Sequence, residues 1–247
     1  MNSVRDKNMN TIYVITVCRN AEFLIEDTIK SVLSQTYSDV KYLIIDGAST
    51  DGTVDIIKKY ADRLTYWVSE PDKGIYDAMN KGLARARELG DGFVNFMNAG
   101  DNFADDNVIE QIFGKNEIGA DKLVVGGHAN LVYEDKIEIF YAQSPEAVKH
   151  KLPYCHQSAF VKLFLSNETW RFDTNLKIAA DYKVFYDIYY KFGAEVYKSV
   201  DVIVANYRME DSMTFNNLKK AKGEYLKIQS AHRDLYWWKE YIKWRCL

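Results

Sequence analysis

Apolar residues change their spacing in a regular alternation along roughly the first hundred positions of the chain. Short continuous apolar runs predict buried strands, and the stretches between them place apolar residues three and four positions apart, which predicts helices with one buried face. The expected strands are residues 12–18, 40–46, 64–69 and 93–97, and the expected helices are residues 21–35, 54–61 and 75–90. Such alternation predicts an α/β fold with a mostly parallel central sheet and helices on both faces.

The second half alternates less regularly. Apolar runs there predict further strands, one of them over residues 155–161, together with a hairpin around Asp135 and a helix over residues 179–193. No repeat or linker divides the chain, so one domain is expected over residues 1–216. Residues 217–247 are expected to form a helical tail.

Composition excludes several classes of protein. The 247 residues are 47% hydrophobic with a formal net charge of −3, which supports a sizeable core but gives no general attraction to nucleic acid. The three cysteines, Cys18, Cys155 and Cys246, form no CxxC pair, which is typical of a reducing, cytoplasmic setting and argues against a zinc site. Residues 1–10 lack the apolar stretch of a signal peptide, and no run approaches the ~18 apolar residues of a membrane-spanning helix.

Polar segments follow all four expected strands of the first half. They are residues 19–22 (RNAE), 46–52 (DGASTDG), 70–74 (EPDKG) and 98–101 (NAGD). In open α/β sheets the ligand lies beyond the carboxyl ends of the strands, so these loops predict a site for a polar, anionic ligand. No GxGxxG follows the first strand and no GxxxxGK[ST] occurs, which argues against a dinucleotide-dependent oxidoreductase and a P-loop NTPase.

Three segments together resemble glycosyltransferase family 2, and most of all its bacterial members that build polysaccharides. They are residues 15–53, 69–86 (SEPDKGIYDAMNKGLARA) and 96–101 (FMNAGD). The resemblance is close over about residues 11–105 and looser to about residue 208. It implies a GT-A fold with a Rossmann-like nucleotide-binding half at 11–105 and an acceptor half at 106–216. It also implies inverting transfer of a sugar from a nucleotide-diphosphate donor, usually UDP-linked, with Mg²⁺ or Mn²⁺, to a glycan or lipid-linked acceptor.

The resemblance places three residues of the first two loops near the nucleotide. Asp46 matches the acid that family members hold against uracil, and a carboxylate suits the imide N–H because it only accepts hydrogen bonds. Thr16, at the end of the first strand, is expected to touch the base or ribose. Arg19 stands where many relatives carry an aromatic residue, and its planar guanidinium can stack in its place. The structural alternatives are a turn-forming Asp46 and a strand-forming Thr16.

The third loop opens a helix and is implied to lie along the ribose and diphosphate. Asp72 and Lys73 are in the loop, where the helix N-terminus favours anions and Lys73 adds a positive charge. Tyr76 and Asp77 follow in the first helical turn. Asp77 also complements the helix dipole, which is its structural alternative.

The fourth loop is implied to hold the metal. Asp101 matches the last acid of the family's DxD-type motif, and Asn98 replaces the first acid. Because Mg²⁺ is often held by one or two protein carboxylates with substrate phosphates and waters, Asp101 is sufficient if the metal arrives with the nucleotide. Asn98 then offers a neutral contact, and the alternative for Asp101 is a helix cap.

Two residues of the second half are implied to act on the acceptor. Asp181 matches the family's catalytic base, and Ala180 replaces the acid that usually precedes it. Asp181 opens a helix whose dipole favours the ionised form, which suits either a base or a structural cap. His156 is expected beside the acceptor, and a satisfied structural histidine is its alternative.

The tail combines basic and aromatic residues. Residues 217–247 contain eight Lys or Arg against three acids, together with Trp237, Trp238 and Trp244. This pattern suits a helix on an anionic membrane surface, which would place the protein at the inner face of the membrane beside a lipid-linked acceptor. It equally suits a helix packed on the domain or on a second subunit of a dimer.

Two alternatives to a glycosyltransferase remain at this point. Asn98 and Ala180 replace acids, so a protein that binds a nucleotide sugar without turnover is one alternative. A nucleotidyltransferase on a similar sheet is the other, but it calls for a Gly-rich basic loop after the first strand, where residues 18–22 read CRNAE.

Overall fold

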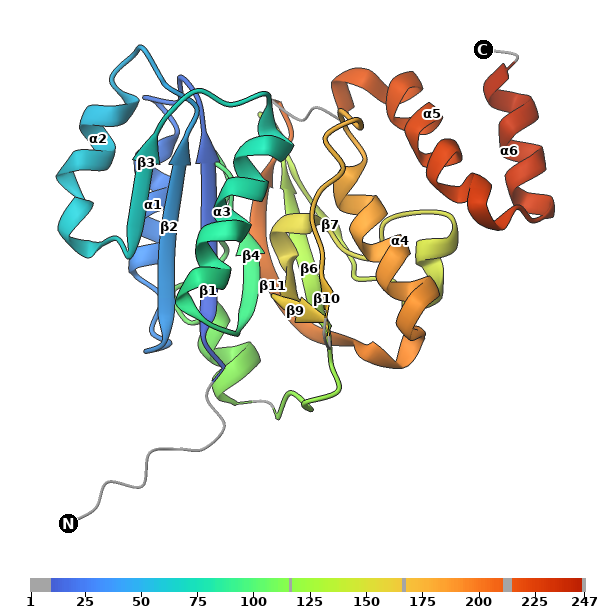
Figure 1. The fold of residues 1–247 in the computed structure, drawn as a ribbon, viewed down its shortest axis with the longest axis horizontal. Helices are drawn as coiled ribbons and strands as arrows, with labels where there is room; N and C mark the ends of the chain where they lie inside the picture. The colour runs from blue at the N-terminus through green and yellow to red at the C-terminus, as the bar shows by residue number, and fades with distance from the viewer. Residues whose placement is uncertain (1–9, 116, 166–167, 211–214, 246–247) are drawn as a thin grey trace.

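The computed structural model describes residues 10–115, 117–165, 168–210 and 215–245 (Figure 1). The first half contains β1 (Ile12–Cys18), α1 (Ile25–Leu33), β2 (Val40–Asp46), α2 (Thr53–Lys59), β3 (Tyr66–Ser69), α3 (Ile75–Leu89), β4 (Phe93–Phe96) and β5 (Asn102–Phe103). The second half contains the π-helical turn Glu110–Gly114, β6 (Val124–Val132), β7 (Ile137–Phe140), β8 (Ala159–Lys162), β9 (Phe164–Leu165), β10 (Glu168–Thr169), α4 (Ala180–Phe192), β11 (Tyr197–Arg208), α5 (Leu218–Gln229) and α6 (Leu235–Arg245).

The main sheet is parallel in its first half and mixed in its second. Its strand order is β3-β2-β1-β4-β8-β6-β11-β5, with β7 paired to β6. Strands β3, β2, β1 and β4 are parallel, and β8 joins them antiparallel to both β4 and β6. The predicted α/β fold is therefore confirmed, and the sheet order changes direction beside β1, where ligands bind in such folds.

Two apolar layers cover the sheet, one on each face. Alternate residues of β1 supply both layers: Tyr13, Ile15 and Val17 pack with α3 and α4, whereas Ile12 and Val14 pack with α1. This division follows from the two-residue period of a strand. All seven residues of β1 are buried, as expected for a central strand covered by helices on both faces.

The expected hairpin around Asp135 forms between β6 and β7, where Tyr133 donates a backbone hydrogen bond to the Lys136 carbonyl. The strand expected from residue 155 begins later. Residues His156–Ser158 form a 3₁₀ turn, and β8 starts only at Ala159. His156 is therefore outside the sheet, at the end of β8 that faces the site.

The tail is helical, and its first helix packs on the domain. Tyr225 of α5 stacks on Tyr182 of α4, with ring centroids 4.2 Å apart, and Gln229 donates to the Tyr182 hydroxyl. Trp237 of α6 is buried and donates to the Leu226 carbonyl. Helix α5 is therefore packed on the domain, which is one of the alternatives for the tail. The boundary between the domain and the tail at residue 217 remains a prediction.

The second helix of the tail leaves large apolar side chains in solvent. They are Leu235, Tyr236, Trp238 and Ile242. Contact of this surface with a membrane or with a second subunit remains a prediction. Among the helices of the described ranges, none is both long and apolar enough to cross a bilayer. Residues 1–9 and Cys246, on which part of the compartment prediction depends, lie outside the described residues.

Substitution of Gly82 tests how closely α3 packs on the sheet. A Cβ at this position would lie 2.6 Å from Cγ2 of Ile15 and 3.4 Å from Cγ1 of Ile45. Helix propensity alone would make Gly82→Ala stabilising by about 1 kcal/mol. We expect the opposite sign, a loss of about 1–3 kcal/mol on chemical denaturation, because the buried Ile15 cannot move away. Ala84→Gly, on the exposed side of α3, is the control for helix propensity. A Gly82→Ala variant more stable than wild type would contradict the close packing of α3 on Ile15 and Ile45.

Candidate functional site

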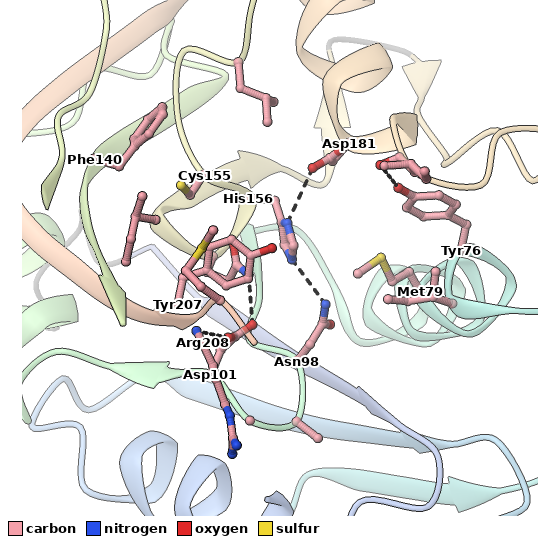
Figure 2. A pocket seen from close by; sticks show the side chains of 18 of the residues that line it. Tyr76, Met79, Asn98, Asp101, Phe140, Cys155, His156, Asp181, Tyr207 and Arg208 are labelled. Atoms are coloured by element: carbon pink, nitrogen blue, oxygen red, sulfur yellow. Dashed lines mark hydrogen bonds and ion pairs between the residues drawn. The ribbon is translucent and has the colours of Figure 1, made fainter. Parts of the chain in front are cut away.

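A cavity of about 500 Å³ opens between the carboxyl end of β4, the start of α3, the start of α4 and the β6–β11 part of the sheet. Six polar or charged side chains line it: Asn98, Asp101, His156, Gln157, Asp181 and Arg208. All of them except Gln157 are labelled in Figure 2. Most of the remaining wall is apolar. Its apolar and aromatic residues include Ile75, Tyr76, Met79, Leu131, Phe140, Leu152, Ile178, Tyr207, Met209 and Leu218.

The turn after β4 is held by a buried threonine of α1. The Thr28 hydroxyl donates to the Asp101 carbonyl (2.7 Å) and accepts the backbone N–H of Gly100 (3.0 Å). Gly100 has φ 102°, a conformation that favours glycine. The Asp101 backbone N–H closes the turn on the Asn98 carbonyl at 3.0 Å. These contacts fix the direction of both cavity-facing side chains of the turn.

Asp101 is 6% exposed, and its carboxylate accepts two hydrogen bonds. Gln157 donates to one oxygen at 2.8 Å, and the backbone N–H of Arg208 donates to the other at 3.0 Å. Burial raises the pKa of Asp101 to about 6, and the two hydrogen bonds only partly oppose this rise. A positive charge brought to this carboxylate would therefore be strongly favoured.

Asn98, His156 and Asp181 form a chain of polar contacts across the cavity (Figure 2). The Asn98 amide nitrogen lies 3.2 Å from Nε2 of His156, and Nδ1 of His156 lies 3.5 Å from an Asp181 carboxylate oxygen. When the Asn98 amide donates to Nε2, the proton of a neutral His156 is on Nδ1, where it faces Asp181. His156 thus connects the two residues instead of pointing to solvent.

Two buried oxygens near Asp101 have no hydrogen-bond donor among the described residues. They are Oδ1 of Asn98 and Oε1 of Gln157. Mg²⁺ and Mn²⁺ prefer oxygen ligands, so these oxygens and Asp101 fit a divalent cation whose remaining ligands come from a bound diphosphate and water. No group of three or more His, Cys, Asp or Glu side chains suited to a metal occurs in the part of the chain that the structure describes.

Hydrogen bonds hold Asp181 and the backbone that precedes it in place. It lies in the first turn of α4, and one of its oxygens accepts the Tyr182 backbone N–H at 2.7 Å. Tyr76 of α3 donates its hydroxyl to the Ile178 carbonyl at 2.5 Å and accepts the Ala180 N–H at 3.3 Å. The Tyr76 hydroxyl is therefore occupied in joining α3 to α4, and only its ring faces the cavity.

A carboxylate of the tail also supports this loop. Glu224 of α5 accepts the backbone N–H groups of Lys177, Ile178 and Ala179, at 2.9, 2.9 and 3.0 Å. These three residues directly precede α4. Glu224 thus positions the start of the helix that carries Asp181, which gives α5 a direct structural link to the site.

Thr16 requires a correction. Strand β1 continues beyond it to Cys18, so Thr16 does not end the strand. Its side chain is fully buried, and its hydroxyl donates to the Met97 carbonyl (2.7 Å) and pairs with the Tyr42 hydroxyl (2.9 Å). These partners are in the core beneath the loops, and contact of Thr16 with a base or ribose remains a prediction.

Asp46 is also fully buried, and its own loop engages both of its oxygens. The Ser49 backbone N–H donates at 2.9 Å and the Ser69 hydroxyl at 2.5 Å, and the Ser49 hydroxyl donates as well. The Cys18 thiol points at the same carboxylate from 3.6 Å, and burial together with Asp46 raises the pKa of this thiol. Asp46 therefore holds the ends of β1, β2 and β3 together, and its contact with a base remains a prediction.

The remaining predicted residues surround the same loops, outside the lining of the cavity. Asp72 accepts the Gly74 N–H at 2.8 Å, and Asp77 accepts the Lys73 N–H at 3.0 Å, so both carboxylates shape the turn before α3. Arg19 and Lys73 are exposed. The structure thus divides the predicted residues into a cavity group and a loop group, both at the carboxyl edge of the parallel strands.

A family model described as glycosyl transferase family 2 matches residues 13–150, more than half of the chain. The protein is a family 2 glycosyltransferase.

Two relatives illustrate how far the similarity extends. An uncharacterized glycosyltransferase of Mycobacterium tuberculosis is 33% identical over 179 residues, which cover 69% of this chain and 66% of that protein. TuaG of Bacillus subtilis, a putative teichuronic acid biosynthesis glycosyltransferase, is 36% identical over 104 residues, which cover 41% of this chain and 40% of TuaG. The chain therefore spans just under two thirds of the first relative and less than half of TuaG.

Solved glycosyltransferases share the fold. S. aureus TarS (residues 1–349) in complex with UDP matches with a TM-score of 0.66 at 17% identity, over 93% of this chain and 68% of that chain. The mannosyltransferase PcManGT of Pyrobaculum calidifontis, in complex with GDP-Man and Mn²⁺, matches with a TM-score of 0.63 at 17% identity, over 92% and 66%. The family 2 glycosyltransferase described here thus has the GT-A fold that its sequence predicts.

Three site residues of this family 2 glycosyltransferase were not predicted from its sequence. They are Thr28, Gln157 and Glu224. Gln157 follows His156 directly, but no local feature of the sequence distinguishes it from an ordinary polar residue. Thr28 and Glu224 act through contacts with residues more than forty positions away, for which the sequence offers no local signal.

The raised pKa of Asp101 predicts a pH-dependent stability. Its ordinary value is 3.8, so the folded state binds this proton more tightly than the unfolded chain does. The free energy of unfolding should therefore fall as pH rises from about 4 to about 6, by up to about 3 kcal/mol from this group. Urea denaturation in EDTA measures it as the difference between wild type and Asp101→Asn. An exposed-site control, Asp55→Asn, should show no such trend, and a pH-independent difference for Asp101→Asn would contradict the assignment.

Proposed function

We propose that this protein is an inverting, metal-dependent glycosyltransferase that transfers a sugar from a UDP-linked donor to a glycan or lipid-linked acceptor in the synthesis of cell-surface polysaccharide. The observation that carries the proposal is the cavity, in which Asp181 faces the Asn98–Asp101 turn through His156. The similarity to TuaG, a putative teichuronic acid biosynthesis glycosyltransferase, supports the acceptor class, and the UDP bound to TarS supports the donor.

Asp181 is the proposed base. In the reaction, the acceptor hydroxyl oxygen forms a bond to the anomeric carbon, the bond from that carbon to the diphosphate oxygen breaks, and the hydroxyl proton passes to Asp181. Asp181 lies in the first turn of α4, and the contact with His156 holds its carboxylate toward the cavity. Inversion follows if the base and the leaving group are on opposite faces of the sugar.

Asp101 is the proposed protein ligand of the metal, with Asn98 and Gln157 as neighbouring oxygen donors. A divalent cation bound there would neutralise charge on the departing diphosphate. The exposed Lys73 and the start of α3 add positive potential along the diphosphate. Mn²⁺ in the PcManGT complex supports a cation of this type.

The apolar wall of the cavity indicates which class of acceptor the proposed enzyme would bind. Leu131, Phe140, Leu152 and Met209 line the cavity together with Asp181. A free glycan would leave much of this surface without a complementary partner, whereas an acceptor with an apolar group near its hydroxyl would cover it. Within the proposed function, the wall therefore favours the lipid-linked acceptor over a free glycan.

The two replaced acids, Asn98 and Ala180, motivate the alternative of a binding protein without turnover. The amide nitrogen of Asn98 lies 3.2 Å from Nε2 of His156, so Asn98 has a partner within the proposed site. Ala180 is fully buried and is absent from the cavity lining, so an acid at that position would not add to the site in this arrangement. Neither replacement removes a group that the proposed reaction requires.

Asp181→Asn tests the base. We expect transfer to fall by about 10²-fold to 10⁴-fold, because an amide cannot take up the acceptor proton. UDP affinity, measured by calorimetry with Mn²⁺, should stay near wild type, since Asp181 is not expected to contact the nucleotide. Asp187→Asn is the matched control, an exposed carboxylate on the same helix.

Retained turnover in Asp181→Asn would rule out this base. A wild-type protein that binds UDP-sugars but neither transfers nor hydrolyses any sugar of a UDP- and GDP-linked panel would instead support the non-catalytic alternative.

Metal binding should depend on the nucleotide. Asp101 is the single carboxylate proposed as a ligand, so calorimetry should detect weak or no Mn²⁺ binding to the protein alone and clear binding once UDP is present. Asp101→Asn should abolish the effect of Mn²⁺ on UDP affinity. Tight binding of Mn²⁺ without nucleotide would show that the proposed ligand set is incomplete.

A further inference from the structure

Asp46, the acid predicted to contact the base, has its hydrogen-bonding capacity taken up by its own loop. Two serine hydroxyls, a backbone N–H and the Cys18 thiol surround its carboxylate, which has no exposed surface. A ligand could reach it only by displacing these groups. The hydrogen-bond acceptor for a base must therefore come from elsewhere at this edge of the sheet.

Asp72 lies over Gly47, the residue that follows Asp46. A Cβ on Gly47 would lie 2.2 Å from Oδ2 of Asp72 and 3.4 Å from Cβ of Arg19. Gly47 does not have a left-handed φ, so space and not backbone conformation excludes a side chain there. The carboxylate of Asp72 thus occupies the position that a side chain of residue 47 would otherwise fill.

The Asp72 carboxylate is oriented and only half engaged. Its Oδ1 accepts the Gly74 N–H at 2.8 Å, whereas Oδ2 accepts no hydrogen bond from residues of the described ranges. The side chain is partly exposed, and the exposed Arg19 begins the neighbouring loop. Strands β1, β2 and β3 pair in register up to Cys18, Asp46 and Ser69, so the loops that follow them start at one edge.

We infer that Asp72, not Asp46, presents the carboxylate that recognises the donor base. This inference rests on the proposed function, because it assumes a nucleotide donor. A free carboxylate oxygen accepts a ring N–H, which uracil carries at N3 and guanine at N1, whereas cytosine has a lone pair at N3 that a carboxylate repels. Arg19, beside the same glycine, supplies donors for the neighbouring base carbonyl or a plane for stacking.

Base selectivity measures this role directly. Calorimetry with UDP, GDP and CDP in the presence of Mn²⁺ should show that the wild type prefers UDP or GDP over CDP by about tenfold or more. Asp72→Asn should lose most of this preference, because its amide can donate to N3 of cytosine. A ratio of affinities does not depend on the fraction of folded protein, so partial misfolding cannot imitate the result. Asp55→Asn, an exposed carboxylate on α2, should keep the wild-type ratio.

Relocating the carboxylate gives a second test. Gly47→Asp alone should weaken UDP binding, because its side chain collides with Asp72. The double variant Gly47→Asp/Asp72→Ala vacates that space and returns a carboxylate to it, so it should regain the preference for UDP or GDP over CDP to within a few-fold of wild type.

An Asp72→Asn variant with the wild-type ratio of UDP to CDP affinity would overturn the inference and leave the proposed function intact. A wild type that binds none of the three nucleotides would overturn the proposed donor itself, and the inference with it.

Discussion

Strand β1 is the constraint on which the rest of this glycosyltransferase depends. It is buried along its whole length and pairs in parallel with β2 on one side and β4 on the other. Because these pairings are parallel, the loops after β1, β2 and β4 leave the sheet at one edge. A shift of one residue in register would turn every side chain of the strand to the opposite layer, so the apolar pattern of β1 also determines where the loops meet.

Hydrogen bonds, more than residue type, distinguish the carboxylates at that edge. Both oxygens of Asp46 accept hydrogen bonds from neighbouring loops, whereas one oxygen of Asp72 accepts none from the residues that the structure describes. Asp101 is buried and accepts two hydrogen bonds, and burial raises its pKa in spite of them. Asp181 faces a histidine across the cavity. Four chemically identical groups thus have four different electrostatic situations, each set by its neighbours.

The second half of the chain completes the site through a change of strand direction. Strand β8 enters antiparallel between β4 and β6, and the turn that precedes it brings His156 and Gln157 to the Asn98–Asp101 turn. Strand β11 contributes the Arg208 backbone N–H to the same carboxylate. Helix α5 then supports the loop before α4 through Glu224, which makes part of the tail a component of the site.

The sequence by itself determined the alternation of strands and helices in the first half, the four polar loops and the family. These features depend on local apolar spacing and on contiguous motifs, which residues 12–101 contain in full. Only the tertiary structure showed that Thr16 belongs to the core, that Asp46 is already engaged and that Gly47 makes room for Asp72. It alone joined Asn98 to His156 and Asp181. The physical reason is that burial and hydrogen bonding come from residues distant in sequence, so a side chain's role depends on neighbours that its local pattern does not specify.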